Sequence, residues 1–323
     1  MLQSVRKEGE HGNLHDDREV AADAAADADS DATQHEVKLS VIIPCLNAER
    51  TIGEQLAALA GQCWPERWEV IVADNGSTDG TLAVVRSFAD RLPGLRVVDA
   101  SQRRGSGYAR NRGAAAARGE WLAFCDADDV VAPGWVAAMG AALARHEFVA
   151  SRFRDDLVND PQRAFAQRLP QQDGLQQYKY PRYLPHAGGS GLGIRAALHR
   201  AVGGFDESFL RLQDTDYCWR VQLHGAALHF APEAVVHCRM RSSALKALRQ
   251  AYLWGEYNVR LYAKYRAHGM PRLTLQDGAR QWLRLLRQAR WLTERGWRER
   301  WLWRLSWRLG RISGSIKYRV LGL

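Results

Sequence analysis

The sequence predicts an α/β fold built on a mostly parallel, doubly wound sheet, followed by a basic helical extension at the C-terminal end. Two patterns support this prediction. From Lys38 onward, short runs of β-branched residues alternate with Ala- and Leu-rich stretches of helical length, which is typical of βαβ units. Beyond Arg241 the strand-like runs stop and the residues favour helix, with one interruption near Gly269 to Pro271.

The individual elements follow from these runs in chain order. Each predicted strand is short and apolar, as expected of strands buried in a parallel sheet. The predicted strands are 39–45, 69–73, 95–99, 120–125 and, after a less regular stretch, 234–238. The predicted helices are 49–61, 79–91, 107–118, 132–144 and 214–224. Asp79 follows a Gly-Ser-Thr turn and can cap the second of these helices.

Charge divides the chain into three segments, although its net charge is only +9. Residues 1–37 contain ten acidic and three basic residues and no aromatic residue, which predicts a disordered acidic tail. Residues 241–323 contain nineteen Lys and Arg, four acidic residues and seven of the twelve Trp. The segment 38–240 between them is nearly neutral, as the core of a soluble enzyme would be.

Cysteine usage and hydropathy bear on the compartment. The five cysteines are odd in number and scattered, so a reducing cytosol fits better than a secreted disulfide framework. Residues 1–20 lack the apolar region of a signal peptide, and no uncharged apolar stretch approaches the roughly 18 residues that span a bilayer. We therefore expect a protein that does not cross a membrane by itself.

Polar residues follow three of the predicted strands at the point where each strand ends. They are PCLNAE at 44–49, DNGSTDG at 74–80 and DADD at 126–129. Open α/β sheets bind ligands in the crevice outside the carboxyl ends of their strands, so these clusters are candidate site residues. The first two are also ordinary turn chemistry, which uses the same residue types.

The third cluster is the most informative, because three carboxylates directly after a buried strand repel one another unless a cation neutralises them. Asp126 and Asp128 share a face of an extended segment and can point into one site. Hard oxygen ligands suit Mg²⁺ or Mn²⁺. No GxxxxGK[ST] and no GxGxxG after the first strand are present, which argues against a P-loop NTPase and a dinucleotide-dependent dehydrogenase.

Taken in order and spacing, the motifs SVIIPCLNAE, VIVADNGSTDGT, GSGYARNRG, FCDADD, GGFDESF and QDTDYCWR resemble family 2 glycosyltransferases. The resemblance covers roughly residues 38–240 and implies the GT-A fold, a Rossmann-like mostly parallel sheet with flanking helices. It also implies a nucleotide-sugar donor, a divalent cation and a single displacement that inverts the anomeric carbon.

The resemblance assigns roles to residues at the strand ends. The residue matching Asp74 contacts the nucleotide base, and the Asp-x-Asp meets ribose and metal. The implied nucleotide-sugar contacts are Pro44, Leu46, Asn47, Glu49, Asp74, Asn75, Ser77, Arg110, Asp126 and Ala127. The implied metal ligands are Asp126, Asp128 and His237. Arg110 could instead be a surface helix residue, and His237 a polar residue at the end of its strand.

The catalytic base implied by the resemblance is Asp214, within Gln213-Asp214-Thr215-Asp216. Gln213 stands where the family has an acid, so any role that needs a charge at that position is not carried over. Asp214 is also a good candidate for the N-cap of helix 214–224, and both roles can coexist. Gly189, Gly191 and Gly193 predict a loop that permits close approach of substrate, or a plain flexible loop.

The basic extension 241–323 has three interpretations. Leu302, Leu305, Leu309 and Ile312 recur at helical spacing with arginines alongside, which suits a helix lying on an anionic membrane surface and equally a helix packed on the core. Nucleic acid is not expected as a partner, because no reading motif accompanies the charge. We predict a cytoplasmic enzyme, peripheral on the inner face of the membrane, with a lipid-linked or envelope-glycan acceptor.

Three alternatives remain at this stage. A sugar-phosphate nucleotidyltransferase also holds a metal at such a sheet, but its Gly-rich basic loop is missing after the first strand. A catalytically silent sugar- or lipid-binding scaffold is disfavoured because Asp126, Asp128 and Asp214 are all present. A processive synthase is disfavoured by the lack of spanning helices and of a QxxRW motif.

Overall fold

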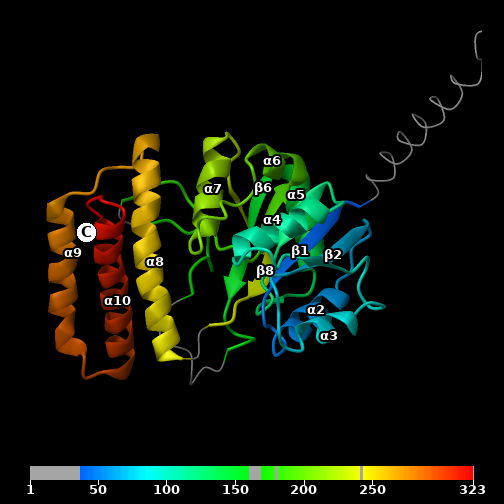
Figure 1. The fold of residues 1–323 in the computed structure, drawn as a ribbon, viewed down its shortest axis with the longest axis horizontal. Coiled ribbons are helices and arrows are strands. Elements are labelled where there is room, and N and C mark those ends of the chain that lie inside the picture. Colours follow the sequence, from blue (N-terminus) through cyan, green and yellow to red (C-terminus); the bar gives the residue numbers. More distant parts are fainter. Residues whose placement is uncertain (1–36, 160–168, 179–180, 241–242, 323) are drawn as a thin grey trace, which may run out of the picture. The chain divides into compact units, whose positions relative to one another are not determined.

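The sheet that the sequence predicts is present in the computed structural model, which describes residues 37–159, 169–178, 181–240 and 243–322 (Figure 1). The expected acidic tail, 1–37, lies outside the described residues except for Val37. The sheet has eight strands in the order β3-β2-β1-β4-β7-β6-β8-β5. Their bounds are β1 Leu39–Cys45, β2 Trp68–Asp74, β3 Arg96–Asp99, β4 Trp121–Phe124, β5 Val130–Val131, β6 Phe148–Arg154, β7 Leu192–Arg195 and β8 His229–His237.

Helices cover both faces of this sheet. Their bounds are α2 Ile52–Ala60, α3 Thr81–Arg86, α4 Ser106–Ala116, α5 Trp135–Arg145, α6 Ala196–Ala201 and α7 Gln213–Leu223. Strand β1 is buried along its whole length, and its alternate side chains enter different cores. Val41 packs in the core formed with α2 and α5, whereas Ile42 packs in the core formed with α6 and α7. This two-sided burial explains why the strand is apolar at consecutive positions.

The position of the site follows from the strand order. Strand β1 pairs in parallel with β2 on one side and with β4 on the other, so the connections leave β1 toward opposite edges of the sheet. Such a switch point opens a crevice outside the carboxyl ends of the two central strands. The segments that follow β1 and β4 are the PCLNAE and DADD clusters, so the fold brings these two clusters side by side.

The second half of the sheet differs from the prediction. Strands β5, β6 and β7 and helix α6 were not predicted, and β8 begins at His229, five residues before the expected start at 234. Strand β7 lies in the glycine-rich segment, where strand propensity is weak. It pairs antiparallel with β4 and β6, and a Cβ on Gly193 would collide with Met139 and Val149. Close packing therefore requires glycine where the sequence suggested a loop.

The C-terminal extension consists of helices, as predicted. Helix α8 spans Ala244–Tyr265, α9 spans Leu275–Gln288 and α10 spans Arg295–Lys317, with short 3₁₀ turns η1 at Arg266–His268 and η2 at Ala289–Trp291. Gly269, at φ 85°, follows η1 at the predicted interruption, whereas the break between α9 and α10 was not predicted. None of the helices among the described residues has the length and apolar character needed to cross a bilayer.

Glycines bring α8 and α10 into close backbone contact. A Cβ on Gly255 would collide with the Trp307 carbonyl, and one on Gly310 with the Tyr252 carbonyl. Figure 1 shows α8, α10 and α9 running alongside one another. One face of α10 is thus a packing face, which agrees with the core-packing interpretation of the extension.

Candidate active site

A cleft of about 550 Å³ opens at the carboxyl ends of β1 and β4. Its lining combines the loops after these strands with the first turn of α7 and the first turn of α8. The lining residues are Pro44, Leu46, Asn47, Ala48, Thr51, Ser106, Arg110, Asp126, Ala127, Asp128, Gly189, Gln213, Asp214, Arg239, Met240 and Lys246. Eight of the residues predicted from the sequence are among them: Pro44, Leu46, Asn47, Arg110, Asp126, Ala127, Asp128 and Asp214.

Three carboxylates after β4 form the acidic wall of this cleft. One oxygen each of Asp126, Asp128 and Asp129 lies within 4.8 Å of the others. Asp129 is buried and accepts a hydrogen bond from the Arg239 backbone N–H at 2.9 Å. Burial, together with the charges of Asp126 and Asp128, raises the pKa of Asp129 to about 8. This oxygen-only donor set fits a hard divalent cation such as Mg²⁺ or Mn²⁺, which would relieve the repulsion.

His237 is not part of this cluster among the described residues. It ends β8, where it pairs with Val130 of β5. Its Nδ1 lies 3.0 Å from an Asp156 oxygen, in a partly exposed position. Asp129 is the third carboxylate of the cluster, and the role of His237 as a metal ligand stays a prediction.

Arg110 is the buried cation of the cleft. It lies on α4, is only 2% exposed, and its Nη2 lies 2.5 Å from an Asp126 oxygen. Its Nε and Nη1 are buried and make no hydrogen bond within the described structure. Since buried donors normally have partners, this guanidinium retains capacity for an anionic oxygen. Gly189 packs against it so closely that a Cβ would lie 2.7 Å from Nη2.

Asp214 faces the cleft from the first turn of α7. The helix begins at Gln213 with Leu212 at the N-cap, so Asp214 is not the N-cap residue. Its Oδ2 accepts from Gly189 N at 3.1 Å and its Oδ1 from Thr215 N at 2.8 Å. Burial raises the pKa of Asp214, which makes its carboxylate a stronger base. The backbone bonds fix the side chain toward the cleft.

The residues after β2 do not line the cleft, but they form hydrogen bonds with the loop after β1, which does. Asn47 N donates to Ser77 Oγ at 3.0 Å, and Thr78 N donates to Asn47 Oδ1 at 2.8 Å. Asp74 accepts from Ser77 N, and the Asn75 amide donates to the Ala100 carbonyl. Glu49 packs beside Gly80. The predicted nucleotide contacts of Glu49, Asp74, Asn75 and Ser77 remain predictions.

The helix expected to begin at Asp79 begins at Thr81, with Gly80 at the N-cap. Asp79 nevertheless accepts a hydrogen bond from Thr81 N at 3.1 Å. Of the three loop glycines, only Gly189 lines the cleft. Gly191, at φ 78°, and Gly193 are needed for packing, because a Cβ at either would meet Ser151 or Met139.

Two basic residues of the cleft were missed by the sequence reasoning. Arg239 follows β8 and donates from Nε to the Asp128 carbonyl at 3.0 Å and from Nη2 to Glu54 at 2.7 Å. Its position directly after a predicted strand could have indicated that Arg239 lies near the site. Lys246 lies in the first turn of α8 and reaches the cleft only because α8 packs against α7. No local pattern marks it. We call the sheet with its flanking helices α2 to α7 the sheet unit.

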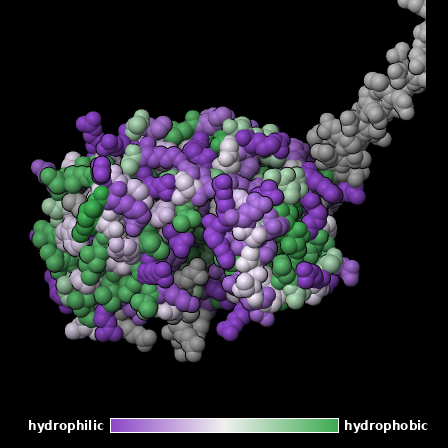
Figure 2. Space-filling model, viewed as in Figure 1, coloured by the Kyte–Doolittle hydropathy of each residue, from purple (hydrophilic) through white to green (hydrophobic). Residues whose placement is uncertain are grey.

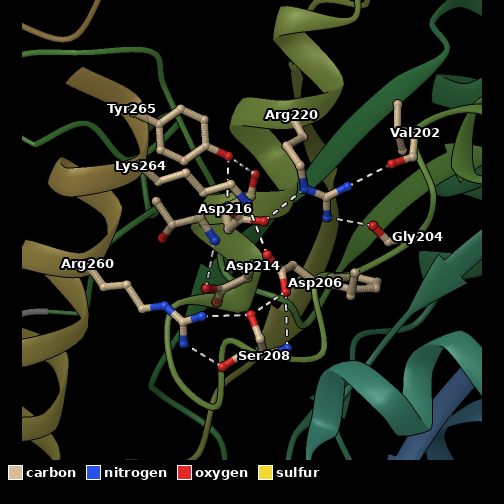
Figure 3. A network of polar contacts seen from close by, with 12 residues as sticks. Val202, Gly204, Asp206, Ser208, Asp214, Asp216, Arg220, Arg260, Lys264 and Tyr265 are labelled. Carbon is tan, nitrogen blue, oxygen red and sulfur yellow. Dashed lines mark hydrogen bonds and ion pairs between the residues drawn. The ribbon is translucent and has the colours of Figure 1, made fainter. Parts of the chain in front are cut away.

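On the side away from the cleft, polar contacts hold helix α7 against α8 (Figure 3). Asp216 is fully buried and contacts Arg220 Nε at 2.8 Å, Lys264 Nζ at 2.7 Å and the Tyr265 hydroxyl at 2.8 Å. Lys264 also donates to Asp206 at 3.0 Å. Asp214 and Asp216 thus point to opposite sides of the same turn, one toward the cleft and the other toward the C-terminal helices.

Comparison with known proteins identifies the family. The model of glycosyl transferase family 2 matches residues 40–203. The chain belongs to glycosyltransferase family 2. Among its relatives, the uncharacterized glycosyltransferase YfnE of Bacillus subtilis (strain 168) is 43% identical over 96 residues, which are 30% of this chain and 24% of that protein. A dodecaprenyl-phosphate galacturonate synthase of Rhizobium johnstonii is 38% identical over 96 residues, 28% of each chain. The match thus spans about a quarter of the length of these curated relatives.

Solved structures show the same fold. The mannosyltransferase PcManGT of Pyrobaculum calidifontis, in complex with GDP-Man and Mn²⁺, has a TM-score of 0.61 at 19% identity and covers 87% of both chains. S. aureus TarS 1-349 in complex with UDP has a TM-score of 0.50 at 20% identity and covers 87% of this chain and 92% of that one. The GT-A fold predicted for this family member is confirmed.

Proposed function

We propose that this family 2 member is an inverting, metal-dependent glycosyltransferase that moves a sugar from a nucleotide-diphosphate donor to an acceptor hydroxyl. The observation that carries the proposal is that one cleft holds the carboxylates of Asp126 and Asp128, the unsatisfied guanidinium of Arg110 and the carboxylate of Asp214. A donor diphosphate needs positive partners, and an acceptor hydroxyl needs a base. The cleft contains both.

The metal fits the residues present. Asp126, Asp128 and Asp129 supply the oxygen ligands that Mg²⁺ or Mn²⁺ prefers, with positions left for water and phosphate. When bound, the cation supplies Lewis-acid stabilisation of the departing diphosphate. PcManGT, the structural relative named above, was solved with GDP-Man and Mn²⁺, which supports a divalent cation without deciding between Mg²⁺ and Mn²⁺.

The reaction is a single displacement. Asp214 Oδ takes the proton of the acceptor hydroxyl while the acceptor oxygen bonds to the anomeric carbon and the bond from that carbon to the diphosphate breaks. Arg110, with Nε and Nη1 free of protein partners, binds diphosphate oxygen as its charge grows. Pro44, Leu46 and Asn47 line the cleft and are proposed to contact the nucleoside. The proton ends on Asp214, and no covalent enzyme intermediate forms.

The acceptor is proposed to be a lipid-linked or envelope glycan, with the enzyme acting on the cytoplasmic face of the membrane as a peripheral protein. Two relatives support this acceptor class by their names. One is the dodecaprenyl-phosphate galacturonate synthase, and another is the poly(ribitol-phosphate) beta-N-acetylglucosaminyltransferase TarS of Staphylococcus aureus, 39% identical over 97 residues. A nucleotidyltransferase is disfavoured because the family model matches glycosyl transferases.

The test is to screen UDP- and GDP-sugars with Mn²⁺ or Mg²⁺ for transfer to glycan and lipid-linked acceptors, and then to repeat the best reaction with Asp214→Asn. Loss of the base should slow transfer about 10²- to 10⁴-fold, with donor binding retained. Asp90→Asn, an exposed aspartate far from the cleft, is the matched control. Undiminished transfer by Asp214→Asn would remove the proposed base, and no turnover of any nucleotide-sugar would favour the silent scaffold.

A further inference from the structure

The helices α9 and α10 leave a set of large apolar side chains on the surface. Six of the thirteen exposed large apolar residues in the described part of the chain lie on these two helices, at 37–75% exposure. They are Leu275, Leu283, Leu286, Leu302, Leu309 and Ile316, which we call the hairpin face. Figure 2 shows hydrophobic side chains gathered over this part of the molecule, next to hydrophilic ones.

The spacing of the hairpin face shows that it is organised. Leu302, Leu309 and Ile316 are separated by seven residues, so they form a stripe along one side of α10. On α9 only Gly278 and Leu285 are buried, although the helix is strongly amphipathic. Most of the apolar side of α9 therefore faces solvent, which an isolated soluble protein has no reason to maintain.

Arginines line two hollows on the same two helices, and the first hollow adjoins the hairpin face at Leu283. A hollow of about 370 Å³ on α9 and η2 is lined by Arg280, Arg284, Arg287 and Arg290 together with Leu283 and Trp291. Arg280 pairs with Asp277 at 3.5 Å, and the remaining guanidinium groups around the hollow repel one another unless further anions lie among them. The hollow thus combines cationic donors with an apolar residue and an aromatic ring.

The second hollow, of about 320 Å³, lies between α9 and α10, on the side of α10 opposite the stripe of Leu302, Leu309 and Ile316. Arg284, Arg304 and Arg308 line it with Trp303 and Trp307. Neutral side chains accept from two of the guanidiniums: Gln288 from Arg304 at 2.6 Å and Gln281 from Arg308 at 2.8 Å. These bonds orient the cations without neutralising them. Burial and the charge of Arg284 lower the pKa of Arg308, as expected for crowded cations.

We propose that the hairpin face is a docking surface for an anionic lipid bilayer, with leucine, isoleucine and tryptophan side chains entering the headgroup region and the first arginine hollow, beside Leu283, receiving lipid phosphates. Interfacial helices combine these residue types, and guanidinium groups pair well with phosphate oxygens. The charge would also attract nucleic acid, but six exposed aliphatic side chains would gain nothing from a phosphate backbone. The proposal rests on the membrane-surface placement proposed above and assigns it to a defined surface.

Docking at this surface would set the direction in which the cleft opens. Helix α10 is held against α8 by the glycine contacts, and α8 is held against α7 through Lys264 and Tyr265 on Asp216. Lys246, at the other end of α8, lines the cleft itself. A rigid helix therefore connects the hairpin face to the cleft, which is suitable for an acceptor anchored in the same bilayer.

Vesicle binding tests the proposal with the full chain. The probes are vesicles of phosphatidylcholine alone and vesicles containing 30% phosphatidylglycerol, in low and high NaCl. Wild-type protein should co-sediment with the anionic vesicles at low salt. Removing three cations in Arg280→Gln/Arg287→Gln/Arg290→Gln should weaken the partition roughly 100-fold, since each basic side chain near the surface contributes a factor of about five.

Matched variants separate specific docking from a general loss of charge. Arg86→Gln/Arg91→Gln/Arg200→Gln removes the same charge from exposed positions of the sheet unit and should bind almost as wild type. Leu283→Gln/Leu286→Gln alters only exposed side chains, keeps the charge, and should weaken the partition roughly tenfold. Retained nucleotide-sugar turnover in solution and unchanged thermal unfolding would show that both hairpin variants are folded.

The outcomes are distinct. Selective loss of vesicle binding in both hairpin variants, with soluble turnover intact, supports the proposal. Absence of wild-type binding to anionic vesicles overturns it, as does equal binding by wild type and hairpin variants. Tighter binding to RNA or duplex DNA than to vesicles, insensitive to the leucine variant, also overturns it in favour of nucleic acid. Because turnover is measured on soluble donor without vesicles, a failed docking surface leaves the proposed transferase activity standing, and the reverse also holds.

Discussion

The cleft and the hairpin face each concentrate like charges, but they hold them differently. In the cleft, Asp126, Asp128 and Asp129 follow one strand and lie within 4.8 Å of one another, with Arg110 and Arg239 bonded to them from two other elements. On the hairpin formed by α9 and α10, the positive charges are at the ends of long arginine side chains spread along two helices. The first arrangement is preorganised for a small, highly charged ion, whereas the second can adapt to an extended anionic surface.

The joint between the two regions is a turn of α7. Asp214 on one side of this turn faces the cleft, and Asp216 on the other side binds α8 (Figure 3). The proposed catalytic base and the residue that binds the C-terminal helices are therefore only two positions apart on α7. The C-terminal helices therefore help to position the site. Four sets of substitutions test how the cleft and these helices depend on each other.

The largest effect is expected from Asp128→Ala in the cleft. Loss of this proposed metal ligand should lower metal-stimulated transfer by at least about 1000-fold, because Lewis-acid stabilisation amounts to several kcal/mol. Initial rates over a titration of Mn²⁺ and Mg²⁺ measure it. Binding to anionic vesicles should not change, so a parallel loss of vesicle binding would contradict the separation of the two charge clusters.

The next effect concerns the joint. Asp216→Asn leaves Lys264 and Arg220 without their buried carboxylate and should lower the free energy of unfolding by about 3 kcal/mol. Urea denaturation measures it. Asp206→Asn removes the other carboxylate near Lys264, which is 30% exposed, and should cost less than about 1 kcal/mol. Equal losses in the two variants would show that Asp216 is not the anchor.

The third effect is a dependence of the free energy of unfolding on pH. It should come from the sheet unit, because α9 and α10 contain no histidine. Burial lowers the pKa of His186 to about 3, so the folded chain stays neutral there while the unfolded chain takes up a proton near pH 6.5. Stability is therefore present above pH 6.5 and is lost as pH falls. Between pH 7.5 and 5, His186 should account for about 2 kcal/mol of this loss, and His199, whose pKa burial lowers to about 4, adds to it.

His186→Phe keeps a ring for the stacking contact with Tyr178 and removes the titrating group. Urea denaturation at both pH values should show a smaller loss of stability in this variant than in wild type. An identical pH dependence in the two proteins would exclude His186 as its source.

The smallest effect is expected from Lys246→Gln, which removes the cation that α8 brings to the cleft. Because Lys246 is exposed, its contact with a donor phosphate should contribute about 1 kcal/mol, which is a roughly fivefold rise in donor KM with little change in kcat. Arg249→Gln, one turn further along α8 and outside the cleft lining, is the control. Equal KM values for the two variants would remove Lys246 from the site.

The first half of the sheet was predictable because its signals are local. Strands β1, β2, β3 and β4 are apolar runs, each followed by turn residues, and their parallel order places DADD beside PCLNAE. Strands β6 and β7 were missed, since FVASRFR mixes polar and apolar residues and LGIR contains a glycine. Their strand conformation depends on neighbours that lie far away in the sequence.

For the site, the sequence indicated the acidic wall and the base candidate but not the whole cleft. Asp129 completes the acidic cluster after β4, and His237 contacts Asp156 at the end of β8. Arg239 and Lys246 come from segments whose place depends on the packing of β8 and α8. A pattern read along the chain contains no such distances.

By itself, the sequence determined the fold class, the family and the carboxylates at the end of β4, because motif spacing and hydrophobic periodicity are properties of neighbouring residues. The tertiary structure decided which charges meet. It placed Arg110 against Asp126, directed Asp214 into the cleft and Asp216 toward α8, and left one side of α9 and α10 uncovered by the other described residues. These are contacts between residues far apart in the chain, and only the folded backbone sets their distances.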